Sequence, residues 1–118
     1  MIEENGNNLS VGERQLLVLA RALLKNTRIL IMDEATASVD HTTDQKIQTV
    51  MRREFKRATV LTIAHRIETI IDCDLILVLQ AGEIVEQGKP SELLLKEEGH
   101  FKALAKELMQ QQQQEQEE

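Results

Sequence analysis

The sequence predicts an α/β fold with a parallel core sheet, on two observations about its apolar residues. Segments with helical spacing alternate along the 118 residues with short, continuous apolar runs. Such runs, bounded by polar residues, are typical of strands buried on both faces of a parallel sheet. Alternation of these strands with helices is the pattern of α/β domains. The length corresponds to about one small domain.

The first helix is predicted to follow Ser10. Residues 1–9 are polar and rich in Asn and Gly, so we expect a loop there. Apolar side chains then recur with helical spacing, and Ser10 is a suitable N-cap. Arg21 and Lys25 lie near the expected end of the helix, where cations suit the helix dipole.

Two buried strands are predicted over residues 28–32 and 58–64, with an amphipathic helix over residues 43–56 between them. A short helix, a third strand, a hairpin partner and two further helices should follow. Ser91 is expected to cap the first of those two helices. In order, these elements cover residues 67–71, 75–79, 83–86, 91–96 and 99–109.

The chain is therefore read as a folded part, residues 1–109, and a tail, residues 110–118. The tail is a run of glutamines followed by Glu-Gln-Glu-Glu, for which we expect a frayed helix end or disorder.

Composition excludes several classes of protein. A net charge of −6 and an aromatic content of 2% argue against a nucleic-acid binder. The N-terminus has no pattern of a signal peptide, and no apolar run approaches the roughly 20 residues that span a bilayer. Cys73 is the one cysteine, which fits a reducing compartment.

Two adjacent acids, Asp33 and Glu34, end the first apolar strand. Acids at the carboxyl end of a buried strand are expected at the binding edge of an α/β sheet. In P-loop ATPases the aspartate of such a strand holds Mg²⁺, and a neighbouring carboxylate can orient or activate the attacking water. The structural alternative is an acidic turn after a strand.

Three other features are compatible with phosphate chemistry and also have ordinary structural explanations. Ser10 and Gly12 begin a helix, whose N-terminus can bind an anion or be a plain cap. Asp40 ends a short polar loop that includes Ser38, and it can cap the next helix. His65 follows the second strand, where it could contact a phosphate or serve only in packing.

Taken together, four segments resemble the motifs of ABC-type nucleotide-binding domains, in the family's order and with its spacing. Residues 8–15 (NLSVGERQ) resemble the signature motif, and residues 29–34 (ILIMDE) resemble Walker B with its glutamate. Residues 38–40 resemble the D-loop, and residues 62–66 (TIAHR) resemble the H-loop. The resemblance implies the C-terminal part of a P-loop ATPase core.

Longer stretches resemble the second nucleotide-binding domain of subfamily C, the multidrug-resistance-associated type. They are NLSVGERQLLVLARALL, DEATASVD, TVLTIAHRIETI and GEIVEQGKPSELL. In the first domain of that group an aspartate often stands at the position of Glu34, whereas the second domain carries glutamate and histidine, as here. The resemblance implies ATP-driven export, with organic anions, conjugates or drugs as cargo by analogy.

The resemblance implies roles for the acids and the histidine. Asp33 would hold Mg²⁺, usually through water, and Glu34 would be the general base or position the water. His65 would contact the γ-phosphate of ATP.

The resemblance also implies that signature and D-loop residues act across an interface. Ser10, Gly12 and Glu13 would contact an ATP held mainly by a partner domain, and Ser38 and Asp40 would contact that partner. Glu13 stands where the family usually has glutamine, and its charge is expected to weaken ATP binding there.

The partners implied are the N-terminal half of the same domain, a second nucleotide-binding domain and transmembrane domains, at the cytoplasmic face of a membrane. The 118 residues contain no G-x-x-x-x-G-K-[ST] phosphate loop, no adenine-stacking aromatic residue and no Q-loop glutamine in the family's pattern.

Two alternatives remain: a non-catalytic fragment that only binds a partner domain, and a soluble ABC ATPase of DNA repair or translation. The second lacks support because the chain has no coiled-coil heptads and no basic face.

The expected incompleteness gives a first prediction. The isolated chain should fold poorly and should not hydrolyse ATP, because its sheet would keep an open edge and uncovered apolar faces. A phosphate-release assay on purified residues 1–118 checks this, and Mg²⁺-dependent turnover would contradict it.

Overall fold

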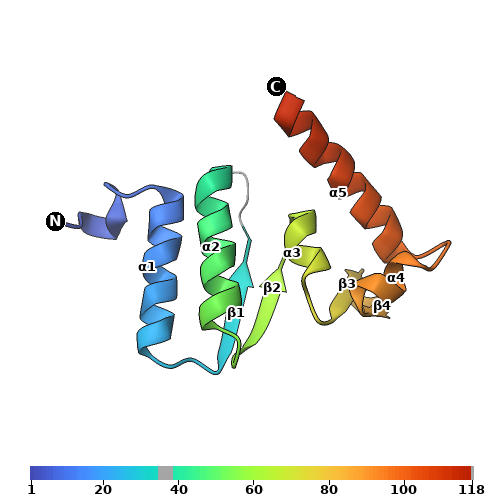
Figure 1. The fold of residues 1–118 in the computed structure, drawn as a ribbon, viewed down its shortest axis with the longest axis horizontal. Helices are drawn as coiled ribbons and strands as arrows, with labels where there is room; N and C mark the ends of the chain where they lie inside the picture. Colours follow the sequence, from blue (N-terminus) through green and yellow to red (C-terminus); the bar gives the residue numbers. More distant parts are fainter. Residues whose placement is uncertain (35–38, 118) are drawn as a thin grey trace. The chain divides into compact units, whose positions relative to one another are not determined.

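The computed structural model describes residues 1–34 and 39–117, which form two compact units, Met1–Ile63 and Ala64–Glu118. The first unit begins with a short 3₁₀ helix, η1 (Glu4–Gly6). It continues with α1 (Val11–Leu24), β1 (Ile29–Asp33), α2 (His41–Glu54) and β2 (Thr59–Ile63). The alternation of helices and strands predicted from the sequence is confirmed, with the boundaries of β1, α2 and β2 shifted by one or two residues (Figure 1).

Strands β1 and β2 pair in parallel, with Ile29 opposite Thr59 and Asp33 opposite Ile63. Successive side chains of a strand point to opposite faces of the sheet. On one face, Leu30 and Met32 pack against a core that α1, α2 and the segments beside them provide. That core consists of Leu19, Ala22, Val39, Ile47 and Phe55.

The other face of β1 and β2 is uncovered. Ile29, Ile31, Leu61 and Ile63 expose 67%, 71%, 54% and 58% of their surfaces. The apolar runs are typical of strands buried on both faces, but uncovered apolar faces were expected for this chain taken alone. That expectation is confirmed, because only one layer of helices packs on the sheet. So large an exposed apolar surface marks an interaction site.

Helix α1 packs closely against the start of α2 at Gly12. A Cβ atom built on Gly12 would lie 2.4 Å from Thr43 Cγ2 and 3.4 Å from Val39 Cγ1. The first of these separations is far inside van der Waals contact. Glycine at this position therefore permits the two helix N-termini to approach.

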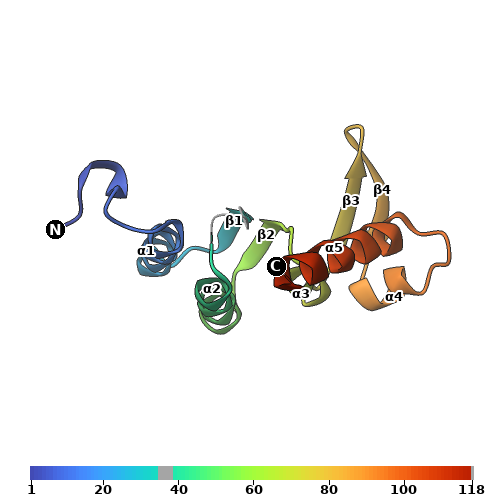
Figure 2. The ribbon, with the colours of Figure 1, turned by 90° about the horizontal axis from the view of Figure 1, so that it is seen from above.

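The second unit contains α3 (Ile67–Ile71), β3 (Ile76–Gln80), β4 (Glu83–Gly88), α4 (Pro90–Leu94) and α5 (His100–Glu117). Strands β3 and β4 form the predicted antiparallel hairpin, turning at Ala81 and Gly82, both with positive φ (Figure 2). The core of this unit consists of Ile67, Val78, Leu93, Phe101 and Ala105.

Two features of the second unit differ from expectation. Helix α4 begins at Pro90 with Lys89 as its N-cap, so Ser91 is not the cap. Proline suits the first helical position because its φ is fixed and no N–H is needed there.

Helix α5 continues to Glu117, into the segment for which fraying or disorder was expected. Glutamine and glutamate are good helix formers, and Gln112 Nε2 donates to Glu68 Oε2 at 3.1 Å.

Glu86 on β4 fixes the start of α5. Only 8% of this residue is exposed, and its Oε2 accepts a hydrogen bond from the His100 N–H at 2.7 Å. Its Oε1 is buried without a hydrogen-bond partner among the described residues. A carboxylate at a helix N-terminus is favoured by the unpaired amides and the dipole there.

Replacing Glu86 should loosen α5. Glu86→Ala leaves the His100 amide without its acceptor and should lower the free energy of unfolding by about 1.5–3 kcal/mol. Glu86→Gln keeps an acceptor and should cost less. Hydrogen exchange of the α5 amides in the intact protein measures both, with exposed Glu83→Ala as control. Equal effects of Glu86→Ala and Glu83→Ala would contradict the role.

The Gly12 contact gives a matched test of packing. Gly12→Ala should destabilise the fold by about 1–3 kcal/mol, the usual range for overpacking. The double variant Gly12→Ala/Thr43→Ser removes the clashing methyl group, keeps the hydroxyl and should recover most of the loss. A double-mutant cycle on the hydrogen-exchange stability of α1 and α2 in the intact protein decides the matter, and strict additivity would argue against the clash.

Candidate functional site

The two adjacent acids at the end of β1 lie in different environments. Asp33 is on the uncovered face of the sheet and is exposed, whereas Glu34 is only 5% exposed. The Glu34 N–H donates to the Ile63 carbonyl at 2.9 Å, which holds its backbone beside the end of β2. The carboxyl edge of the sheet thus presents one solvated and one sheltered carboxylate.

Gln48 is a neighbour of Glu34 that sequence reasoning missed. Its side-chain Nε2 donates to Glu34 Oε1 at 2.7 Å, from the second turn of α2. Gln48 follows the buried Ile47 and precedes Met51 by three residues, so it lies near the inward face of an amphipathic helix. A polar amide beside the apolar face of a helix is expected to have a hydrogen-bond partner, so the helical spacing could have indicated this contact.

The N-terminus of α1 is closed by a capping box. Glu13 N–H donates to Ser10 Oγ at 3.2 Å, and the Ser10 N–H donates to Glu13 Oε2 at 2.8 Å. The prediction that Ser10 is an N-cap is confirmed. Glu13 stands where the resemblance leads one to expect glutamine. It has a structural role here because its side chain completes the capping box, and a glutamine could fill the same role.

Asp40 caps α2, as the sequence indicated, and its Oδ2 accepts from the Thr43 N–H at 3.0 Å. Hydrogen bonds from Thr43, first from its side chain and then from its backbone, hold the pKa of Asp40 below its ordinary value. Through the close contact of Gly12 with Thr43, the capped starts of α1 and α2 lie side by side. Ser38 is outside the described residues.

His65 belongs to the second unit. It is exposed and follows β2 by two residues, directly before Arg66, the N-cap of α3. Its expected role in phosphate contact stays a prediction.

The residues present fit a magnesium ion with few protein ligands. In the described parts of the chain, no three His, Cys, Asp or Glu side chains gather as a metal site. Asp33 offers exposed carboxylate oxygens, and Mg²⁺ commonly takes one or two carboxylates, keeping waters and substrate phosphates as its other ligands. Asp33 therefore suits a site that substrate and water complete.

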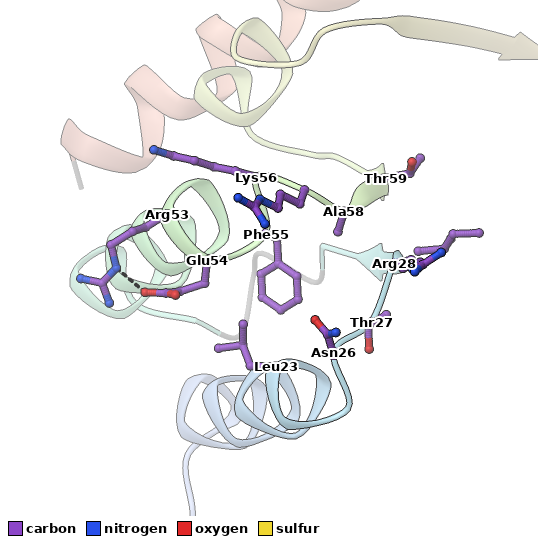
Figure 3. Close-up of a pocket in the computed structure, with 12 residues that line it drawn as sticks. Leu23, Asn26, Thr27, Arg28, Arg53, Glu54, Phe55, Lys56, Ala58 and Thr59 are labelled. Carbon is purple, nitrogen blue, oxygen red and sulfur yellow. Dashed lines mark hydrogen bonds and ion pairs between the residues drawn. The ribbon is translucent and has the colours of Figure 1, made fainter.

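A cavity of about 820 Å³ lies in the first unit, and it does not include Asp33 or Glu34. Its wall contains Ile29 and Thr59, the first residues of β1 and β2, so it is at the opposite end of the strands (Figure 3). The acids have the chemistry expected of a catalytic site, and the cavity is a separate feature.

Helices that could cross a membrane are not found in residues 1–34 and 39–117: none combines the needed length with the needed apolarity.

Comparison with known proteins gives consistent matches. The family model for the ABC transporter matches residues 1–37. The chain is 56% identical over 106 residues to ATP-binding cassette sub-family C member 2 of Rattus norvegicus, covering 90% of this chain and 7% of that protein. It is 62% identical over 93 residues to bile pigment transporter 1 of Saccharomyces cerevisiae, covering 79% and 6%.

The fold has a similar counterpart among solved structures. A bacterial Atm1-family ABC exporter with ATP bound matches with a TM-score of 0.74 and 43% identity, over 87% of this chain and 18% of that one. The chain thus spans only a small part of the proteins that it matches. The motifs, the α/β fold and these similarities together support the assignment of this chain to the ABC-type nucleotide-binding domains, as a segment of one.

Proposed function

We propose that this chain is the C-terminal half of the second nucleotide-binding domain of a subfamily C exporter, which binds and hydrolyses ATP to drive transmembrane export. The main observation is the pair of acids at the end of β1, with Asp33 exposed and Glu34 sheltered and hydrogen-bonded to Gln48. The similarity to sub-family C member 2 and to an exporter with ATP bound supports the same function.

Each residue near the phosphates has a distinct task in this proposal. Asp33 holds Mg²⁺, through water, and the ion neutralises phosphate charge when it is bound with ATP. Glu34 orients the attacking water and accepts its proton. His65 contacts the γ-phosphate and helps to align it with the water.

Gln48 supports Glu34 by limiting the rotation of its carboxylate. The Gln48 amide donates to Oε1 at 2.7 Å, so this oxygen is held from the side of α2. Loss of orientation in a general base lowers the rate even when its chemistry is unchanged. Gln48 is therefore a positioning residue in this proposal.

Signature residues serve a second nucleotide-binding domain. Ser10 Oγ already accepts from the Glu13 N–H, and its own O–H remains a possible donor to a phosphate. Gly12 allows the helix start, with its free amides, to approach closely. Ser38 and Asp40, from the D-loop, contact the partner domain across the same interface.

The uncovered face of β1 and β2 is the proposed contact with the N-terminal half of the domain. Four aliphatic side chains on that face are more than half exposed. Further strands and helices bearing the phosphate loop would bury them and complete the site. Transmembrane domains complete the proposed exporter, with this chain at the cytoplasmic face of the membrane.

The alternative is a non-catalytic fragment that binds a partner nucleotide-binding domain through its signature and D-loop residues. The observation in its favour is that Gly12 and Asp40 lie at the adjacent starts of α1 and α2, where a partner could contact both. It predicts co-purification with a partner domain, and no change in turnover when Glu34 is replaced.

The role of Glu34 is tested in the intact exporter. Glu34→Gln keeps the side chain's shape and an acceptor for Gln48, but it cannot take a proton. ATP turnover should fall about 10²–10⁴-fold, while ATP binding and ATP-dependent pairing of the two domains persist.

The control variant is Glu107→Gln, which removes an exposed carboxylate on α5. It should leave turnover unchanged. Phosphate release and nucleotide binding are measured for both variants. Wild-type turnover in Glu34→Gln would reject Glu34 as the base and favour the non-catalytic fragment.

A further inference from the structure

The cavity at the start of β1 and β2 has no part in the proposed hydrolysis. Its volume of about 820 Å³ falls within the range of small-molecule sites, which is about 300–1,000 Å³. It lies where α1 and α2 end, so residues of both helix ends and of both following loops line it. All of these residues belong to the first unit.

The cavity is basic in a chain whose net charge is −6. Four cationic side chains line it, against the single carboxylate of Glu54, and that carboxylate is paired with Arg53. Arg28, Lys56 and Arg57 are the other three, and none has an ion pair among the residues that the structure describes. The lining therefore carries a surplus of positive charge.

Compensation of helix dipoles is the competing explanation for these cations. Arg52 and Arg53 lie in the last turn of α2, where the effect operates, and it explains them. Arg28 lies four residues after the end of α1, and Arg57 lies three residues after the end of α2. The dipole effect falls off beyond the last turn, so it does not explain why these two line one cavity.

The inner wall of the cavity is apolar with one amide. The Phe55 ring, on a residue only 5% exposed, points into the space between the two helix ends, and Leu23 and Asn26 face it from the other side (Figure 3). Such a wall favours a ligand with a carbon body over a bare inorganic ion. Arg28 and Arg57 also line the cavity, and an arginine guanidinium can donate two parallel hydrogen bonds to one phosphate group.

We propose that this cavity binds a cyclic polyol or similar compact ring that bears several phosphates. The ring contacts Phe55 and Leu23, and the phosphates contact Arg28 and Arg57, while Lys56 adds positive charge at the rim of the cavity. A free inositol polyphosphate and a phosphoinositide headgroup share this chemistry. The site is separate from the acids of β1, and the inference does not rest on the proposed ATPase activity.

Binding is tested with the intact protein while its nucleotide site is saturated with ATP analogue. Inositol hexakisphosphate is titrated by calorimetry, and vesicles with and without phosphatidylinositol 4,5-bisphosphate are tested by co-sedimentation. The triple variant Arg28→Gln/Lys56→Gln/Arg57→Gln should raise the Kd about tenfold or more, since each lost contact is charge-assisted.

A control variant with the same change in net charge separates binding in the cavity from non-specific electrostatic attraction of the probe to the protein. Lys96→Gln/Lys102→Gln/Lys106→Gln changes the net charge equally, using exposed lysines of the second unit. It should leave the Kd within about twofold at physiological salt, where distant exposed charges are screened. The single variant Arg57→Gln provides a milder test should the triple variant fold poorly.

Each outcome decides the proposal. Binding of the soluble probe that the cavity variants weaken identifies a free ligand site, and binding of the vesicles alone identifies a lipid headgroup site. No binding of either probe, or equal weakening by both triple variants, would overturn it. If the ligand proposal fails, the proposed role of Glu34 still stands, because the cavity variants should keep the basal ATP turnover.

Discussion

The alternation of side chains along β1 is the constraint on which the first unit depends. It turns Leu30 and Met32 toward the core that the helices form, and it turns Ile29, Ile31 and Asp33 to the other side. The next residue, Glu34, is tied to β2 through its backbone and to α2 through Gln48. The same pleat that builds the core therefore also separates the two acids and gives each its own surroundings.

Much of this architecture could be predicted because it rests on local patterns. Apolar runs marked β1 and β2, and Ser10 and Asp40 marked the starts of two helices. The order of elements and the hairpin turn at Ala81 and Gly82 followed from equally local signals.

The features that could not be predicted depend on contacts between distant segments. Gln48 and Glu34 are separated by 14 residues, as are Glu86 and His100. Nothing local distinguishes Glu86 from the exposed acids near it, since its burial results from the packing of α5 on β4. The same holds for the cavity, whose cations come from two segments, residue 28 and residues 53–57, that meet only in the folded unit. The spacing of residues along the sequence identifies motifs, whereas contacts between distant residues can be found only when the topology of the fold is known.

The capping box at Ser10 and Glu13 limits which substitutions the signature segment tolerates. Position 13 must supply an acceptor of a particular length to the Ser10 amide, which restricts it to glutamate and glutamine. Exchange between these two changes the charge of the helix start by one unit and leaves the capping box intact. In the proposed ATP site between two nucleotide-binding domains, substitution at this position could therefore change the affinity for ATP without a cost in folding, and it could make the two sites of such a pair unequal.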